Sequence, residues 1–207
     1  MTREQPRYAD HTYRSGSGML GGSLLLLLIL GLTGEGILNG EGRIRWLSLA
    51  WLVFLVPLVF AFSLRPAVFA GRERLRVRNP FRTITLPWAS VEEVRAAYSS
   101  EVFAGGRKYQ MWAIPVSLRQ RKKALRKGGG PVASPNLAAP GAAFTAGAAG
   151  GAHQAQADQA VEEIRTLAER HAAEEAAQGA PTVRWAYEVL APLAVGGIAL
   201  LYLLFLA

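Results

Sequence analysis

The chain has 207 residues, of which 51% are hydrophobic, and it carries a formal net charge of +8 and no cysteine. The missing cysteine excludes disulfides, thiolate metal sites, iron–sulfur clusters and cysteine nucleophiles. The hydrophobic residues gather in three blocks, near residues 19–38, 46–64 and 185–206, which leaves room for one small domain between the second and third.

The second and third blocks predict transmembrane helices. Residues 46–64 contain no charge, and a helix of that length rises about 28 Å, close to the thickness of the hydrocarbon core of a bilayer. Residues 185–206 begin with Trp185 and Tyr187, aromatic side chains typical of the membrane–water interface. Glu188 lies within a turn of them, so we expect it to reach the headgroups.

The first block, residues 19–38, also predicts a transmembrane helix. Its strongly apolar part is short, and the helix must accommodate Glu35 near its far end. The preceding tail, residues 1–18, carries arginines, as the start of a signal peptide does. No Ala-x-Ala cleavage site follows the leucine run, so we expect an uncleaved helix.

Basic residues predict the orientation. The stretch from Arg65 to Lys127 holds fifteen Lys or Arg residues against four Glu. An excess of cations close to a membrane segment marks the cytoplasmic side. We therefore predict that the N-terminus and the soluble region face the cytoplasm and that the C-terminus lies outside.

The first part of the soluble region, residues 65–118, predicts short antiparallel strands. Apolar and basic residues alternate around Leu75 and Val77, and this period of two is typical of a half-buried strand. Gly105-Gly106 predicts a tight hairpin. Several strands at this spacing favour a small barrel or a strongly bent sheet.

The second part of the soluble region differs in composition. Residues 128–154 are rich in Gly, Ala and Pro, which predicts a disordered linker. Residues 155–177 predict an amphipathic helix, because Val161, Ile164 and Ala168 follow the i, i+3, i+7 pattern. Together these segments predict a membrane protein with three transmembrane α-helices and one α+β domain.

The motif strings Leu75-Arg-Val-Arg-Asn79, Arg82-Thr83 and Leu86-Pro-Trp88 resemble those of bacterial PH-like domains of the low-molecular-weight protein antigen type. The resemblance implies a seven-strand bent barrel closed at one end by a helix, in a multi-pass protein of the bacterial plasma membrane. It implies no enzyme activity and no cofactor. Residues 155–177 are our candidate for the closing helix, and residues 116–127 are the rival.

The residues themselves also argue against catalysis. His11, His153 and His171 lie far apart and have no metal-ligand spacing. The adjacent pair Glu92-Glu93 would point to opposite faces of a strand. No glycine-rich loop has the context of a phosphate-binding motif. We therefore expect neither an enzyme nor a metal or cofactor site.

Two binding functions remain. The favoured one is an adaptor or scaffold that presents its PH-like domain to a protein partner at the inner membrane face. The alternative is a module that binds anionic lipid headgroups through a basic strand face. The candidate contact residues are Arg72, Arg74, Arg76, Arg78 and Arg82. Nucleic-acid binding through residues 121–127 is not favoured, because basic runs beside membranes are mostly topology signals.

Overall fold

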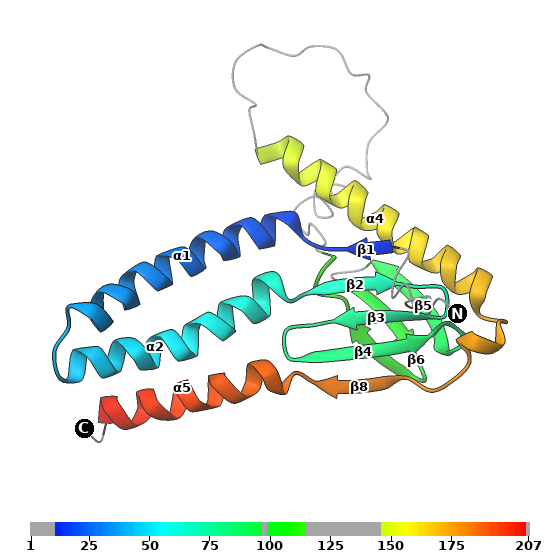
Figure 1. The fold of residues 1–207 in the computed structure, drawn as a ribbon. Coiled ribbons are helices and arrows are strands. Elements are labelled where there is room, and N and C mark those ends of the chain that lie inside the picture. Colours follow the sequence, from blue (N-terminus) through cyan, green and yellow to red (C-terminus); the bar gives the residue numbers. More distant parts are fainter. Residues whose placement is uncertain (1–10, 97–98, 115–145, 206–207) are drawn as a thin grey trace, which may run out of the picture.

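The structure is a computed structural model that describes residues 11–96, 99–114 and 146–205. Three long apolar helices lie at one end of the molecule and two β-sheets lie at the other (Figure 1). The helices are α1 (Gly16–Leu38), α2 (Arg43–Val59, continued by a π-helical turn, Phe60–Leu64) and α5 (Tyr187–Phe205). Each is long and apolar enough to cross a membrane, which confirms the prediction of three such helices.

The helices pack as a layer, with α2 against both α1 and α5. Glycines permit close contacts: a Cβ atom on Gly22 of α1 would lie 2.1 Å from the Cβ atom of Ser63, and one on Gly196 of α5 would lie 2.7 Å from the backbone nitrogen of Phe54. At the end away from the sheets, Arg43 donates hydrogen bonds to the carbonyl of Leu203. Gly196 therefore serves the helix–helix contact.

The strands form a five-stranded and a three-stranded antiparallel sheet. The larger sheet has the order β1 (His11–Tyr13), β2 (Ala67–Ala70), β3 (Arg74–Arg78), β4 (Arg82–Pro87), β8 (Thr182–Trp185). The smaller sheet has the order β5 (Val91–Ala96), β6 (Ser100–Ala104), β7 (Arg107–Gln110). The β6–β7 turn is the predicted hairpin, with Gly105 at φ 56° and Gly106 at φ 67°, the positive angles that a type I′ turn requires.

Each apolar helix continues directly into the five-stranded sheet. β1 precedes α1, β2 follows the π-helical turn, and β8 precedes α5, so the three connections lie at the same end of the helices (Figure 1). Two predicted boundaries are corrected here. The segment 1–18 is not only a tail, because His11–Tyr13 pairs with β2. The third apolar helix begins at Tyr187, because Trp185 ends strand β8.

The predicted closed barrel is wrong. After β4, the 3-10 turn Trp88–Ser90 redirects the chain into the second sheet. The free edge of β4 pairs instead with β8, which comes from the far end of the chain. The two sheets therefore pack as separate layers and do not close into a seven-strand barrel.

Helix α4 (Ala146–His171) covers the core between the sheets. Val161, Ile164 and Ala168 are buried there, as the predicted stripe requires. The helix begins at Ala146, so residues 146–154 are helical rather than part of a linker, and a 3-10 turn (Glu175–Ala177) follows it. Outside the described residues lie 115–118 of the predicted barrel, the rival helix 116–127 and the rest of the predicted linker.

Candidate binding face

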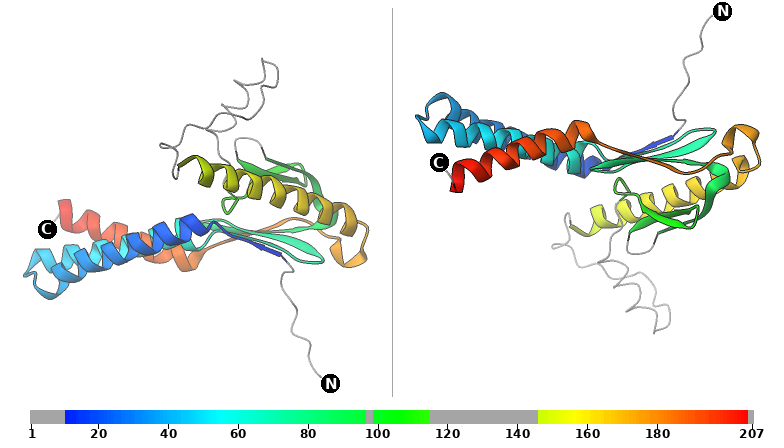
Figure 2. Two further views of the ribbon diagram at one scale, coloured as in Figure 1. Left: turned by 90° about the horizontal axis from the view of Figure 1, so that it is seen from above. Right: turned by 90° about the horizontal axis from the view of Figure 1, so that it is seen from below.

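One face of the five-stranded sheet is open. Figure 2 shows α4 and the three-stranded sheet on one side of it, and no described element on the other. In β3, Leu75 and Val77 are fully buried on the covered side. Because side chains alternate along a strand, Arg74, Arg76 and Arg78 lie on the open side.

The strand register places two further arginines on the open side. Arg78 pairs with Thr83, and Thr83 pairs with Arg184 in β8, so these three residues form one row across the sheet. Arg14 follows β1 directly, and its guanidinium lies 5.9 Å from the ring centre of Phe69 in β2. We call the following set the arginine face: Arg14, Arg74, Arg76, Arg78 and Arg184.

Phe69 organises part of this face. The guanidinium of Arg78 lies 5.4 Å from the Phe69 ring centre, and the guanidinium of Arg14 lies 5.9 Å from the same ring centre. Cations within about 6 Å of a ring centre are attracted to it by roughly 0.5–1 kcal/mol at exposed sites. Two arginines are therefore held beside one aromatic ring before any ligand arrives.

The charges on this face repel one another. The pKa of Arg78 is lowered, first by its partial burial and then by the positive charges of Arg65, Arg14 and Arg76, and the carboxylate of Glu188 offsets only part of this effect. A bound anion would relieve that repulsion, because an opposite charge favours the charged form of a guanidinium. The arrangement is thus suited to an anionic ligand.

The rest of the open side offers mainly hydroxyl groups. The outward positions of the neighbouring strands are Thr12, Ala67, Phe69, Thr83, Thr85, Pro87 and Thr182, and none is acidic. Glu73, in the turn before β3, forms an exposed ion pair of 2.6 Å with Arg74. Such a pair contributes less than about 1 kcal/mol, so a partner carboxylate or phosphate can compete for this arginine.

The five predicted contact residues do not all lie on one side of the sheet in the structure. Arg74, Arg76 and Arg78 share the open side. Arg72 is exposed in the turn between β2 and β3. Arg82 begins β4 and alternates with Thr83, which puts it on the same side as Ile84, opposite the arginine face. Arg82 therefore lies on the other side of the sheet from the arginines of β3.

Sequence reasoning missed Arg14 and Arg184. Both immediately precede apolar helices, where an arginine is explained by membrane topology alone. Only the pairing of β1 with β2 and of β4 with β8 brings them onto the same sheet as the arginines of β3. A weak signal existed in Thr182–Trp185, a short run of β-favouring residues before the third helix.

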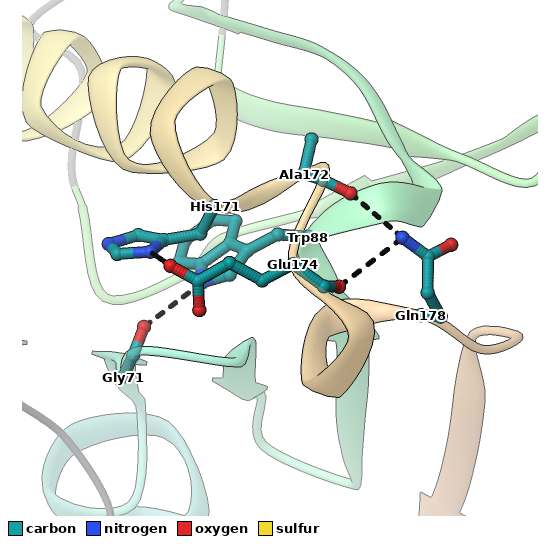
Figure 3. A network of polar contacts seen from close by, with 6 residues as sticks. All are labelled: Gly71, Trp88, His171, Ala172, Glu174 and Gln178. Carbon is teal, nitrogen blue, oxygen red and sulfur yellow. Dashed lines mark hydrogen bonds and ion pairs between the residues drawn. The ribbon is translucent and has the colours of Figure 1, made fainter.

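The motif residues have structural roles. Asn79 is 3% exposed, and its Nδ2 donates to the carbonyl of Gln110 at 2.8 Å while its Oδ1 accepts from the backbone N–H of Trp112 at 3.3 Å. It thus joins the β3–β4 turn to the end of β7. Trp88 is fully buried, and its Nε1 donates to the carbonyl of Gly71 at 3.0 Å (Figure 3).

Arg65 connects these turns to the apolar helices. It is 6% exposed and lies between the π-helical turn and β2. Its guanidinium donates to the carbonyl of Asn79 and, at 2.8 Å, to Glu188 in the first turn of α5. The start of α5, the end of α2 and the β3–β4 turn therefore meet at one buried arginine.

The motif strings, their contacts and the sheet packed beneath α4 point to one family. Residues 65–167 match the family model of the bacterial PH domain. The match covers about half of the chain and runs from Arg65 into α4. It does not extend to the narrower antigen type or to membrane attachment. No curated protein and no solved structure matches the chain.

Polar contacts among residues 171–178 close the C-terminal end of α4. His171 Nδ1 lies 2.6 Å from a carboxylate oxygen of Glu174, and the side-chain amide of Gln178 donates to the carbonyls of Ala172 and Glu174 (Figure 3). These contacts satisfy carbonyls that a helix end leaves open. Within residues 11–96, 99–114 and 146–205, no cluster of His, Asp and Glu could hold a metal ion.

Strand β1 is also joined to α4. The hydroxyl of Tyr13 donates to Glu163 at 2.6 Å. Burial raises the pKa of Tyr13, and the hydrogen bond and negative charge of Glu163 raise it further. The segment just before α1 is therefore an integral part of the PH domain's packing, although it lies outside the matched range.

Proposed function

We propose that this protein is a non-enzymatic, membrane-anchored adaptor whose PH domain binds an acidic segment of a protein partner on the arginine face. The observation that carries the proposal is that face: five arginines from three parts of the chain meet on an open sheet side whose outward strand positions hold no carboxylate. Guanidinium groups are well matched to carboxylates in geometry and charge.

The anchoring rests on the three apolar helices. Large side chains on α1, such as Leu24 and Leu27, are 68% and 66% exposed, which is unfavourable in water and ordinary in lipid. All three helices join the sheet at the same end. If the helices span the membrane, the whole PH domain lies on one side of it. The basic residues of that domain favour the cytoplasmic side.

The shape of the arginine face favours an extended protein segment. Arg74 and Arg78 are separated by four residue steps along β3, or about 13 Å at 3.3 Å per residue. A single headgroup phosphate would not span that length. An acidic peptide segment laid along the strand could pair with several of these arginines in turn.

Binding of a fluorescent deca-glutamate peptide to the full chain in a zwitterionic detergent tests the proposal. The triple variant Arg74/Arg76/Arg78→Ala should bind about tenfold or more weakly, because each exposed pair contributes up to about 1 kcal/mol. A matched variant, Arg107/Lys108/Arg170→Ala, removes three cations elsewhere and should change the affinity less than about twofold. Equal affinities of the two variants would contradict the proposal.

Anionic lipid is the second candidate, favoured by the row nearest the helices. Arg14 lies two residues before α1, Arg184 lies three before α5, and Arg78 lies between them in the sheet. A basic residue near an anionic surface gains about 1 kcal/mol. In nanodiscs, enrichment of labelled phosphatidylglycerol around the protein should then fall for Arg14/Arg78/Arg184→Ala and persist for Arg74/Arg76→Ala. Peptide binding lost in Arg74/Arg76→Ala supports the adaptor instead.

A further inference from the structure

Three aromatic side chains from separate elements meet where the PH domain joins the apolar helices. The ring of Phe62 lies 5.3 Å from that of Phe81 and 5.6 Å from that of Trp112, both edge-on. We call Phe62, Phe81 and Trp112 the junction aromatics. Phe62 belongs to the last turn of the apolar helix, whereas the other two belong to the PH domain.

Hydrogen bonds hold the two PH-domain rings at this position. The carbonyl of Phe81 accepts from the backbone N–H of Ala186 at 2.9 Å, just before α5. The backbone N–H of Trp112 donates to Asn79, in the same turn as Phe81. The β3–β4 turn and the turn after β7 are thus fixed against the ends of two apolar helices.

These rings are more exposed than their packing would suggest. Phe62 is 42% and Trp112 is 48% exposed, and Trp185 at the end of β8 and Tyr187 at the start of α5 are 55% and 70% exposed. Trp and Tyr side chains favour the boundary between hydrocarbon and water, because the ring is apolar and its polar atom can stay hydrated. The exposed rings extend the apolar helix surface onto the PH domain.

We propose that the turns carrying Phe81 and Trp112 lie within the interfacial region of the bilayer, so that the PH domain contacts lipid directly. This inference rests on the proposed membrane anchoring. The occupant is the glycerol and upper acyl region of the bilayer lipids, and the contact needs no anionic headgroup. Continuity with the apolar surface of α2 through Phe62 carries the assignment to lipid rather than to a protein partner.

Nitroxide labels on single cysteines test the inference, because the chain contains no cysteine. The full chain is reconstituted in phosphatidylcholine vesicles with a label at Trp112→Cys or, with Trp112 retained, at Phe81→Cys. Leu27→Cys in α1 is the membrane reference, and Arg107→Cys in the β6–β7 hairpin is the aqueous reference. Collisions with oxygen and with a water-soluble nickel complex are measured by electron paramagnetic resonance.

We expect the labels at positions 81 and 112 to lose nickel accessibility relative to position 107 and to gain oxygen accessibility towards that of position 27. Labels at 81 and 112 that are as open to nickel as position 107, with position 27 shielded, would overturn this inference and leave the anchoring intact. If position 27 is also accessible to nickel, both this inference and the proposed membrane anchoring are contradicted. Peptide binding to the arginine face is read out separately and is unaffected by either result.

Discussion

A single amide side chain joins the two sheets of the PH domain. The Asn79 side chain donates to the carbonyl of Gln110 at the end of β7 and accepts from the backbone N–H of Trp112 just after it. The sequence shows Asn79-Pro80 only as a turn, because turn chemistry is local and the bonded residues are more than thirty positions away. Its structural role depends on the position of the second sheet, which local sequence patterns do not predict.

Replacement of Asn79 by Ala should lower the free energy of unfolding by about 1–3 kcal/mol, because it leaves the partly buried carbonyl of Gln110 and N–H of Trp112 without these partners. Thermal unfolding of the detergent-solubilised protein, followed by circular dichroism, measures this. Gln110→Ala is the matched control, since only the backbone carbonyl of Gln110 is used. A loss of similar size in both variants would show that the amide contacts are not responsible.

Tyr13 should make the stability of the folded protein decrease at alkaline pH. Its pKa is raised in the folded state, by burial first and then by Glu163, whereas a free phenol titrates near pH 10. A group with a raised folded pKa stabilises fully below its unfolded pKa and loses that contribution as pH rises. The stability of the native protein should therefore fall more steeply above about pH 10 than that of Tyr13→Phe.

Urea unfolding at pH 8 and at pH 10.5 measures this difference between the two proteins. At pH 8 the Phe variant should be less stable by about 1 kcal/mol, the contribution of one hydrogen bond. The gap between them should narrow at pH 10.5. A gap that stays constant would mean that the pKa of Tyr13 is the same in the folded and unfolded states.

At the scale of elements, periodicity predicted what depends on neighbours in sequence. The apolar helices, the β6–β7 hairpin and the buried stripe of α4 all follow from local patterns. Strand β8 does not, because Thr182–Trp185 is short and its partner β4 lies far back in the chain. Because this pairing is not predictable from local patterns, we expected a closed barrel in place of two sheets and did not include Arg184 in the candidate site.

The contact between α2 and α5 depends on one glycine. A Cβ atom on Gly196 would meet the backbone of Phe54 at 2.7 Å, and backbone cannot move aside cheaply. Gly196→Ala should therefore destabilise the protein by about 1–3 kcal/mol. At the adjacent Gly197, a Cβ atom would lie 3.7 Å from the Phe54 ring, an ordinary contact. Gly197→Ala should be neutral or stabilising by up to about 1 kcal/mol, because alanine favours helix.

Unfolding in mixed micelles of increasing dodecyl sulfate content ranks the two alanine variants against the native protein. The order Gly197→Ala, native, Gly196→Ala in decreasing stability supports glycine-mediated packing of α5 on α2. The reverse order of the two variants would refute it.

For the whole molecule, the three connections at one end of the helices fix which segments share a side of the membrane. The PH domain and the start of α1 lie together, and the link between α1 and α2 lies at the opposite end (Figure 1). With the domain in the cytoplasm, a membrane-impermeant maleimide should label Glu41→Cys in intact cells. Arg107→Cys should react only after lysis. The opposite pattern would invert the proposed orientation.

Strand β8 is synthesised after every other strand of the five-stranded sheet, because it follows α4 in the chain. Until then β4 has an unpaired edge, the feature through which nascent chains pair wrongly with one another. An excised fragment restricted to residues 65–167 would keep this edge permanently, and it would also lose the edge that β1 covers on β2. Such a fragment should aggregate. A fragment expressed to study this domain therefore has to include β1 and β8.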